Sequence, residues 1–239
     1  MPDLEQYAKT VRGFRSNLGD EDMNPLVYVE RDGALIATLF AQNVSKVEGL
    51  MLARYAAFGF AADAVVFAAD MRMVVGKPGE EALPVNPVSG QVWKQGQMQA
   101  LAEDGAAQAL GITDCVVLIC AERGVAGVKS VALPYRVAAG SVDFLHGGEA
   151  EHITSMSGGI SDALLSFFAE QTLESRVAAN PLLLGLVAAA EDLTPQEQLL
   201  HIRCTVVKYL MALGFAVLLH PQSDLETEVY ARSLPQPKE

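Results

Sequence analysis

The chain is organised around the stretch Gly59-Phe-Ala-Ala-Asp63-Ala-Val-Val-Phe-Ala-Ala-Asp70-Met-Arg72, which places a wholly apolar run between two acids. The run 64–69 has no polar residue in either alternation, which is typical of an inner strand covered by helices on both faces. A second stretch, Gly111-Ile-Thr-Asp114-Cys-Val-Val-Leu-Ile-Cys-Ala-Glu122-Arg123, repeats this order of residue types. The two stretches therefore predict two buried strands, each preceded by a helix.

The sequence before the first of these stretches predicts a helix, a hairpin and a second helix. Asp32-Gly33 stands between two apolar runs and favours a tight hairpin turn with positive φ. Ser45-Lys-Val-Glu48 matches a capping box at the start of a helix. The expected elements are a helix at 3–16, strands at 26–31 and 34–40, and a helix at about 44–58.

The sequence after the second stretch predicts an antiparallel meander and then helices. Glycine-containing turns separate three apolar runs, and Thr194-Pro-Gln-Glu197 matches another capping box with proline at its favoured position. The run 215–219 fits a strand or a continuation of the last helix, and periodicity over five residues does not decide. The expected elements are strands at 115–121, 128–137 and 141–145, and helices at 95–110, 160–173, 181–190 and 194–213.

This order, α-ββ-α-β-α-βββ and then helices, is typical of the α+β class. We predict a mixed, largely antiparallel sheet with helices packed on it, followed by a helical C-terminal portion. Residues 1–220 are expected to form a single domain, with a boundary near 150–160 as the alternative. Residues 221–239 are polar and predict a loose tail.

The composition limits the classes of partner and compartment. The 239 residues are 51% hydrophobic and carry a formal charge of −12, which disfavours a nucleic-acid partner because phosphates are bound by clustered Lys and Arg. No stretch reaches the ~18 apolar residues of a membrane helix, and the first residues lack a signal-peptide pattern. Three cysteines without metal-site spacing predict buried thiols. We therefore expect a cytoplasmic protein outside the membrane.

Two strand-end carboxylates, Asp70 and Glu122, are the candidate catalytic residues, with Arg72 and Arg123 beside them. If the two strands are neighbours, the acids converge at one sheet edge and hold a divalent ion or divide acid and base roles. The simpler alternative is that each acid ends its strand in water and its charge is balanced by the adjacent arginine.

Four residues, His146, Glu149, Glu151 and His152, are the densest set of metal-ligand types in the chain. Imidazole and carboxylate groups suit transition metals, but the spacing matches no zinc-protease motif and two glycines indicate a loop. A solvated turn is the alternative interpretation.

The stretch Asn86-Pro-Val-Ser-Gly90-Gln-Val-Trp93-Lys-Gln-Gly96-Gln-Met-Gln99 contains the single tryptophan of the chain. Trp93, with Asn86, is a candidate partner-binding residue, since an amphipathic aromatic on a loop is a frequent hot spot. The alternative is that Trp93 fills the core beneath the loop. Together with 59–70, this stretch resembles uncharacterised proteins of actinobacterial phages and their hosts, over the first half of the chain. That resemblance implies a phage-related origin and no particular activity.

The common nucleotide-binding and hydrolase signatures are absent from the sequence. We therefore expect an accessory or protein-interaction factor, with a metal-assisted hydrolase as the alternative, using either Asp70 and Glu122 or the loop from His146 to His152. Whether the protein is an enzyme stays open, and the sequence assigns no cofactor. The apolar C-terminal helices also predict a homo-oligomer.

Overall fold

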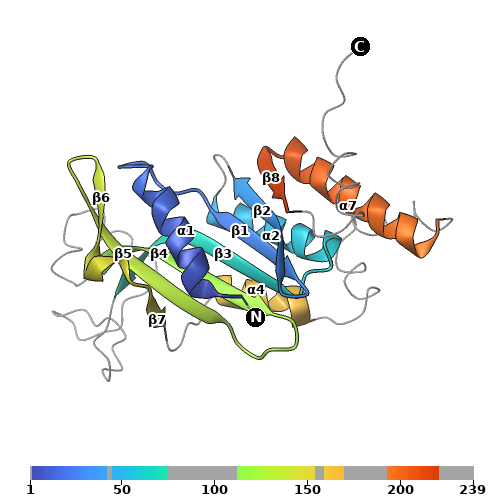
Figure 1. The fold of residues 1–239 in the computed structure, drawn as a ribbon, viewed down its shortest axis with the longest axis horizontal. Coiled ribbons are helices and arrows are strands. Elements are labelled where there is room, and N and C mark those ends of the chain that lie inside the picture. The colour runs from blue at the N-terminus through green and yellow to red at the C-terminus, as the bar shows by residue number, and fades with distance from the viewer. Residues whose placement is uncertain (1, 42–44, 75–111, 154–158, 170–192, 221–239) are drawn as a thin grey trace, which may run out of the picture.

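The computed structural model describes residues 2–41, 45–74, 112–153, 159–169 and 193–220 (Figure 1). Its centre is an eight-stranded sheet with the order β6-β5-β4-β3-β1-β2-β8, and β7 also pairs with β5. Every described strand pair is antiparallel. The predicted α+β class is confirmed. The strands are β1 (Leu26–Arg31), β2 (Ala34–Ala41), β3 (Ala64–Val74), β4 (Ile112–Glu122), β5 (Lys129–Ala138), β6 (Ser141–Phe144), β7 (Glu151–Ile153) and β8 (Phe215–Leu219).

Tight turns join β1 to β2 and β5 to β6. Asp32 and Gly33 both have positive φ, 54° and 74°, so the predicted β1–β2 hairpin is confirmed. Ala139 and Gly140, with φ of 51° and 77°, make the equivalent turn between β5 and β6. The predicted meander of β4, β5 and β6 is also confirmed.

Helices cover both faces of the sheet, as the apolar β3 run predicts. Helix α1 (Leu4–Ser16) lies on one face against β4, β5 and β6 (Figure 1). Helices α2 (Lys46–Gly59), α4 (Gly159–Ala169) and α7 (Pro195–Ala212) lie on the other face. Along β3, Val65 and Phe67 join the core beneath the three helices, while Val66 and Ala68 join the core beneath α1. All four side chains are fully buried.

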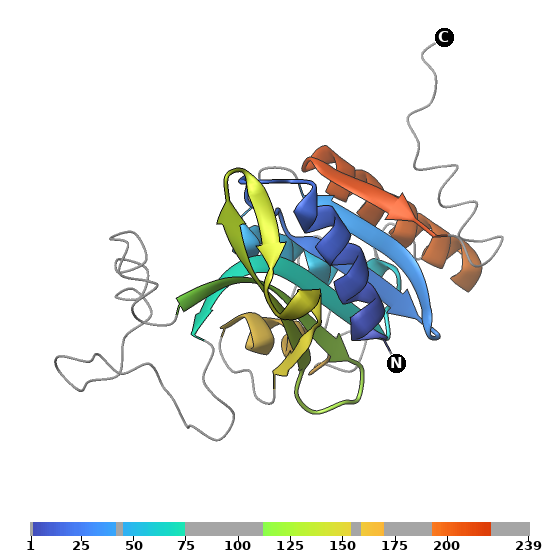
Figure 2. The same ribbon diagram turned by 60° about the vertical axis from the view of Figure 1, so that its left-hand side comes forward.

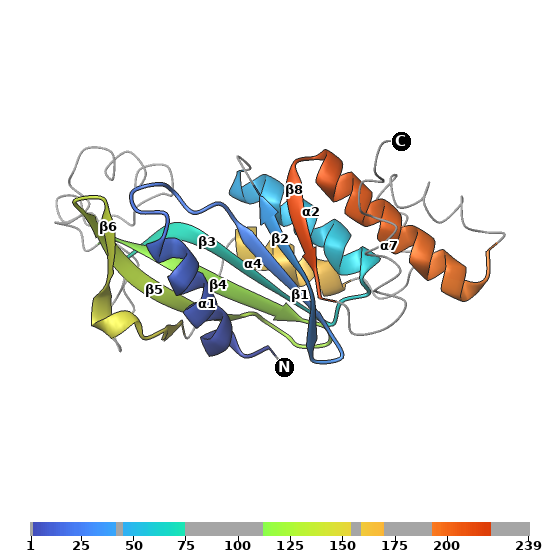
Figure 3. The same ribbon diagram turned by 45° about the horizontal axis from the view of Figure 1, so that its top comes forward.

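The C-terminal part of the sheet resolves the ambiguity that the sequence left at 215–219. Thr194 caps α7 through the predicted capping box, and Gly214, with φ of 87°, reverses the chain after the helix. The following residues form β8, which pairs with β2 and lies beside α7 (Figure 3). The run is therefore a strand, because it completes the backbone hydrogen bonds of β2.

Two short elements, the 3-10 turn η2 (Leu145–Gly148) and strand β7, occupy the glycine-rich connection where no regular structure was expected. A strand of three residues is too short to show alternation in the sequence. The helices expected at 95–110 and 181–190 lie outside the described residues.

The two repeated stretches, which contain the apolar runs of β3 and β4, are not equivalent in the structure. Asp63 precedes β3 and lies in the turn after α2, whereas Asp114 lies inside β4, opposite Arg72 of β3. The predicted repeat therefore holds for the buried apolar runs and not for the acids before them.

Candidate functional site

Of the two candidate catalytic carboxylates, only Glu122 lies at the end of its strand. Asp70 lies inside β3, which continues to Val74, so the prediction that it is a strand-end acid is wrong. Asp70 of β3 pairs with Val116 of β4, and Glu122 of β4 pairs with Ala64 of β3. Six residues of strand therefore separate the two acids, which corresponds to about 20 Å. The expectation that they converge is wrong, because β3 and β4 are antiparallel and Asp70 lies inside β3 while Glu122 lies opposite the first residue of β3.

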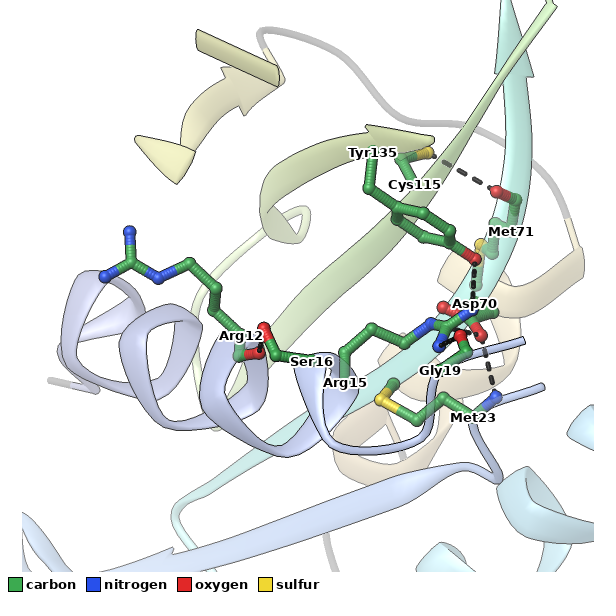
Figure 4. Close-up of polar contacts among 9 residues, drawn as sticks. All are labelled: Arg12, Arg15, Ser16, Gly19, Met23, Asp70, Met71, Cys115 and Tyr135. Carbon is green, nitrogen blue, oxygen red and sulfur yellow. Dashed lines mark hydrogen bonds and ion pairs between the residues drawn. The ribbon is translucent and has the colours of Figure 1, made fainter. Parts of the chain in front are cut away.

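Asp70 instead belongs to a buried polar cluster on the α1 face of the sheet (Figure 4). The residue Asp70 is 7% exposed, and Arg15 of α1 is 1% exposed. The Oδ2 atom of Asp70 lies 3.1 Å from Nε of Arg15 and accepts a hydrogen bond of 2.7 Å from the backbone N–H of Met23. The carboxylate thus holds both the end of α1 and the segment that follows it.

The guanidinium of Arg15 extends the cluster to two further segments. Its Nη1 donates to the carbonyl oxygen of Gly19 at 2.9 Å, and its Nη2 donates to the hydroxyl of Tyr135 at 3.3 Å. The guanidinium carbon also lies 4.6 Å from the centre of the Tyr135 ring, a cation–π arrangement. We call Arg15, Asp70 and Tyr135 the Arg15 cluster; it joins α1, β3 and β5.

Burial decides the protonation behaviour of the Arg15 cluster. Burial raises the pKa of Asp70, whereas the hydrogen bond from the Met23 amide and the charge of Arg15 lower it. The effect of burial is the larger, so the pKa of Asp70 lies above its ordinary value. Burial also raises the pKa of Tyr135. For Arg15, burial lowers the pKa, but the Tyr135 hydroxyl and the Asp70 charge outweigh it, so the pKa ends above its ordinary value. A buried carboxylate already engaged by arginine fits a structural ion pair better than a metal ligand or general base.

At the C-terminal end of β4, Glu122 and Arg123 form ion pairs and a hydrogen bond with neighbouring segments. Lys129 Nζ lies 2.6 Å from Oε1 of Glu122 across the β4–β5 hairpin. Arg123 donates to the carbonyl oxygen of Ala62 at 2.6 Å, and its Nε lies 3.6 Å from Oδ1 of Asp63. The partner of Glu122 is thus Lys129 and that of Arg123 is Asp63, whereas the simpler interpretation paired Glu122 with Arg123. The side chain of Arg72 lies outside the described residues.

The four candidate metal ligands do not form a site among the described side chains. Glu151 and His152 are consecutive in β7, so their side chains point to opposite faces of the sheet. His152 lies 3.9 Å from Glu5 of α1, and Glu149 is exposed. The side chain of His146 is not described. Within the described residues, no group of three or more His, Cys, Asp or Glu is placed to hold a metal ion.

Trp93 and Asn86, the candidate partner-binding residues, lie outside the described residues. The structure draws attention to a different surface, the outer edge of β8. No described strand lies beyond β8, which ends the sheet on one side as β6 ends it on the other (Figure 2).

One hydrogen bond shows which backbone groups of β8 point away from β2. His220 N–H donates to the carbonyl oxygen of Ile36 at 2.9 Å, so this residue turns its backbone groups towards β2. Backbone direction alternates along an antiparallel strand, so Ala216 and Leu218 also face β2. The N–H and C=O groups of the intervening residues point out of the sheet. These outward residues are Phe215, Val217 and Leu219.

The side chains at this edge are apolar and uncharged. Strand β8 has the sequence Phe-Ala-Val-Leu-Leu, and Leu218 is 48% exposed on the α1 face. Met211 and Leu213, at the end of α7, are exposed as well. Three of the seven exposed large apolar side chains in the described residues thus fall within 211–218. We call β8 with Met211 and Leu213 the β8 edge.

His220, which follows β8, couples this edge to pH. Its Nε2 lies 3.1 Å from Oγ1 of Thr38, and burial lowers its pKa below 6.5. At a pH between the lowered pKa of His220 in the folded chain and its value of 6.5 in the unfolded chain, the unfolded chain binds a proton that the folded chain does not. The stability supplied by neutral His220 is therefore fully present above pH 6.5 and is lost as the pH falls through the pKa of His220 in the folded chain.

We expect the free energy of unfolding of the wild type to fall more than that of His220→Gln between about pH 7.5 and about pH 5. Glutamine keeps a hydrogen-bonding group near Thr38 but does not titrate. Urea unfolding at the two pH values measures the difference, and His152→Gln, which removes an exposed ring, is the control. Equal losses in the wild type and His220→Gln would contradict the assignment.

All three cysteines, Cys115, Cys120 and Cys204, are buried as predicted. Burial raises the pKa of the Cys115 and Cys120 thiols to about 12, so neither is a reactive nucleophile. The described helices include none that is long and apolar enough to cross a membrane.

No protein-family model matches the chain, and comparison with curated proteins and with solved structures finds no match either. The candidate site therefore rests on geometry alone. Sequence reasoning missed Arg15, although this residue continues the buried stripe of Leu4, Ala8 and Val11 along α1. It also missed the β8 edge, for which the signal was a wholly apolar run at 215–219.

Proposed function

We propose that the protein is a cytoplasmic accessory factor that binds a protein partner by adding one of the partner's strands to β8. The observation that carries this proposal is an apolar sheet edge whose outward N–H and C=O groups are open in the described structure. Strand addition to such an edge is a recurring mode of peptide recognition, in which the main chain supplies hydrogen bonds and alternate side chains supply specificity.

The contrast between the two sheet edges supports this assignment. Natural proteins protect edge strands by making them short or by placing charges on them. Strand β6 has only four residues and carries Asp143, whereas β8 carries no charge along its five residues. One edge of the sheet is thus protected and the other is suited to pairing.

The metal-assisted hydrolase is the weaker candidate. One form of it requires Asp70 and Glu122 to share a site, and the strand register separates them. The other form uses the loop from His146 to His152, where the described residues include no group of three placed to hold a metal ion. Each acid also has its own cationic neighbour, Arg15 for Asp70 and Lys129 for Glu122.

A peptide that contains the β8 sequence Phe-Ala-Val-Leu-Leu, flanked by lysines for solubility, is the probe for strand addition. We expect it to bind the wild type in fluorescence anisotropy and to slow hydrogen exchange at the N–H of Val217. Val217→Pro removes an outward N–H but leaves the bonds to β2, so binding should weaken by roughly 10-fold or more. A peptide of equal charge with prolines at alternate positions should not bind.

Leu218→Lys tests the side chains of the same edge, and Val137→Lys is its matched control. Both residues are exposed apolar residues, 48% and 42%, but Val137 lies in β5, at the far side of the sheet. We expect only Leu218→Lys to weaken peptide binding. Unchanged binding in both Val217→Pro and Leu218→Lys, with the fold intact by circular dichroism, would contradict strand addition at β8.

A further inference from the structure

We infer that the partner at the β8 edge is a second copy of this chain, paired antiparallel through β8 about a two-fold axis at Val217. This inference rests on the proposed function, since it names the occupant of the same edge. Two-fold dimers are the commonest homo-oligomers, and their interface must be self-complementary.

The backbone of β8 meets this requirement of self-complementarity. With the axis at Val217, each Val217 faces its own equivalent, and Phe215 faces Leu219 of the second copy. These are the three residues whose N–H and C=O groups point outward, as the bond from His220 to Ile36 establishes. In an antiparallel pair, facing residues of this kind exchange both hydrogen bonds. Every outward N–H of one copy therefore finds an acceptor in the other.

The side chains are compatible with the same register. On the α1 face, Ala216 of one copy faces Leu218 of the other, so a small side chain stands opposite a large exposed one. On the opposite face, Phe215 and Leu219 are already buried against the core. The pairing thus adds apolar contact without requiring either core residue to move.

Charge makes this edge the favoured one for self-association. Each copy carries a formal charge of −12, so most surfaces would bring like charges together. Strand β8 carries none, and like charges directly opposite one another in a sheet are destabilising. The far edge does not share this property, because β6 carries Asp143.

Exposed apolar side chains extend the contact beyond the strand. Met211 and Leu213 lie at the end of α7, next to the Gly214 turn that leads into β8. A pairing of five-residue strands with these few apolar side chains buries a modest area, which fits a reversible dimer rather than an obligate one.

Sedimentation equilibrium over a range of concentrations tests the dimer directly. The chain has a mass of 25.5 kDa, and we expect reversible formation of a species of twice that mass. Val217→Pro removes one outward donor from each copy, so the dissociation constant should rise roughly 10- to 100-fold. Leu218→Lys should also weaken the dimer, and Val137→Lys should not. A dimer that persists unchanged in Val217→Pro and Leu218→Lys would overturn the inference.

Cysteine cross-linking tests the register. Facing residues that exchange hydrogen bonds lie about 5.5 Å apart at their Cα atoms, within the range that a disulfide spans. We therefore expect Val217→Cys to form a covalent dimer on mild oxidation, while Val137→Cys, at the far side of the sheet, does not. Equal cross-linking of the two variants would count against the register.

The peptide experiment separates failure of this inference from failure of the proposed function. A monomer at all concentrations that still binds the β8 peptide would overturn the second copy and retain strand addition to a different protein. A monomer that does not bind the peptide would overturn both, and would indicate that the edge is covered by the chain itself.

Discussion

Replacing Asp70 with alanine should lower the free energy of unfolding by about 3–5 kcal/mol, because the change leaves the buried charge of Arg15 without its counter-ion. Arg15 is 1% exposed, so water cannot replace the carboxylate. The change also removes the acceptor for the N–H of Met23, which anchors the segment after α1. Urea unfolding followed by circular dichroism measures the loss.

Glu122→Ala is the control, since Glu122 is also an ion-paired acid on the same face of the sheet. Its partner Lys129 has a side chain that is 42% exposed, so its charge remains solvated when the acid is removed. We expect a loss of about 1 kcal/mol or less. A similar loss for both variants would show that the Arg15 cluster is no more important than a surface ion pair.

The double variant Arg15→Met with Asp70→Leu removes both charges. It therefore distinguishes the effect of losing the whole ion pair from the effect of leaving one charge without its partner. Burial raises the pKa of Asp70, which means that the environment does not fully compensate its charge. When the charges of a buried ion pair are not fully compensated, replacing both residues by apolar ones is often neutral or stabilising. We therefore expect the double variant to regain most of the stability that Asp70→Ala loses.

The sequence was sufficient for the features that depend on local chemistry. The β1–β2 turn follows from Asp32-Gly33 because few other residues adopt positive φ. The start of α7 follows from Thr194 and Glu197, which satisfy the first N–H groups of the helix. The apolar run 64–69 required cover on both faces, which α1 and α2 supply.

The sequence was not sufficient for features that depend on how distant segments pair. A helix expected between two strands suggests parallel strands, yet β3 and β4 are antiparallel, and this single fact separates Asp70 from Glu122. The contact between Arg15 and Tyr135 joins residues 120 positions apart, and nothing local to either one predicts it. Likewise, 215–219 becomes an edge strand only because β2 offers it a partner.

Gly59, the last residue of α2, illustrates the same point. Local reasoning places this glycine at the end of a helix, where positive φ is common, but the residue with positive φ is Ala61. The reason for Gly59 lies in α7. A Cβ atom added to Gly59 would lie 2.9 Å from a Cγ atom of Val206 and 3.0 Å from its Cβ. The glycine thus allows α2 and α7 to approach closely.

Gly59→Ala should therefore destabilise the protein by about 1–3 kcal/mol, the usual effect of overpacking a core. Val206 is 1% exposed and β-branched, so it cannot rotate away easily. Gly13→Ala is the control, because Gly13 lies inside α1 with nothing within 4 Å of an added Cβ. There, alanine should stabilise by about 0.5–1 kcal/mol through its higher helix propensity. The same substitution is thus expected to have opposite signs in two helices.

Combining Gly59→Ala with Val206→Ala distinguishes a steric clash from a change in helix propensity. Removing the two Cγ atoms of Val206 relieves the closest contact, so the double variant should be more stable than the sum of the single effects predicts. Urea unfolding of the four proteins in this cycle gives the coupling energy. Additive effects would mean that the α2–α7 contact does not explain Gly59. A stabilising coupling would show that the packing of α7 against α2 depends on the absence of a side chain at residue 59.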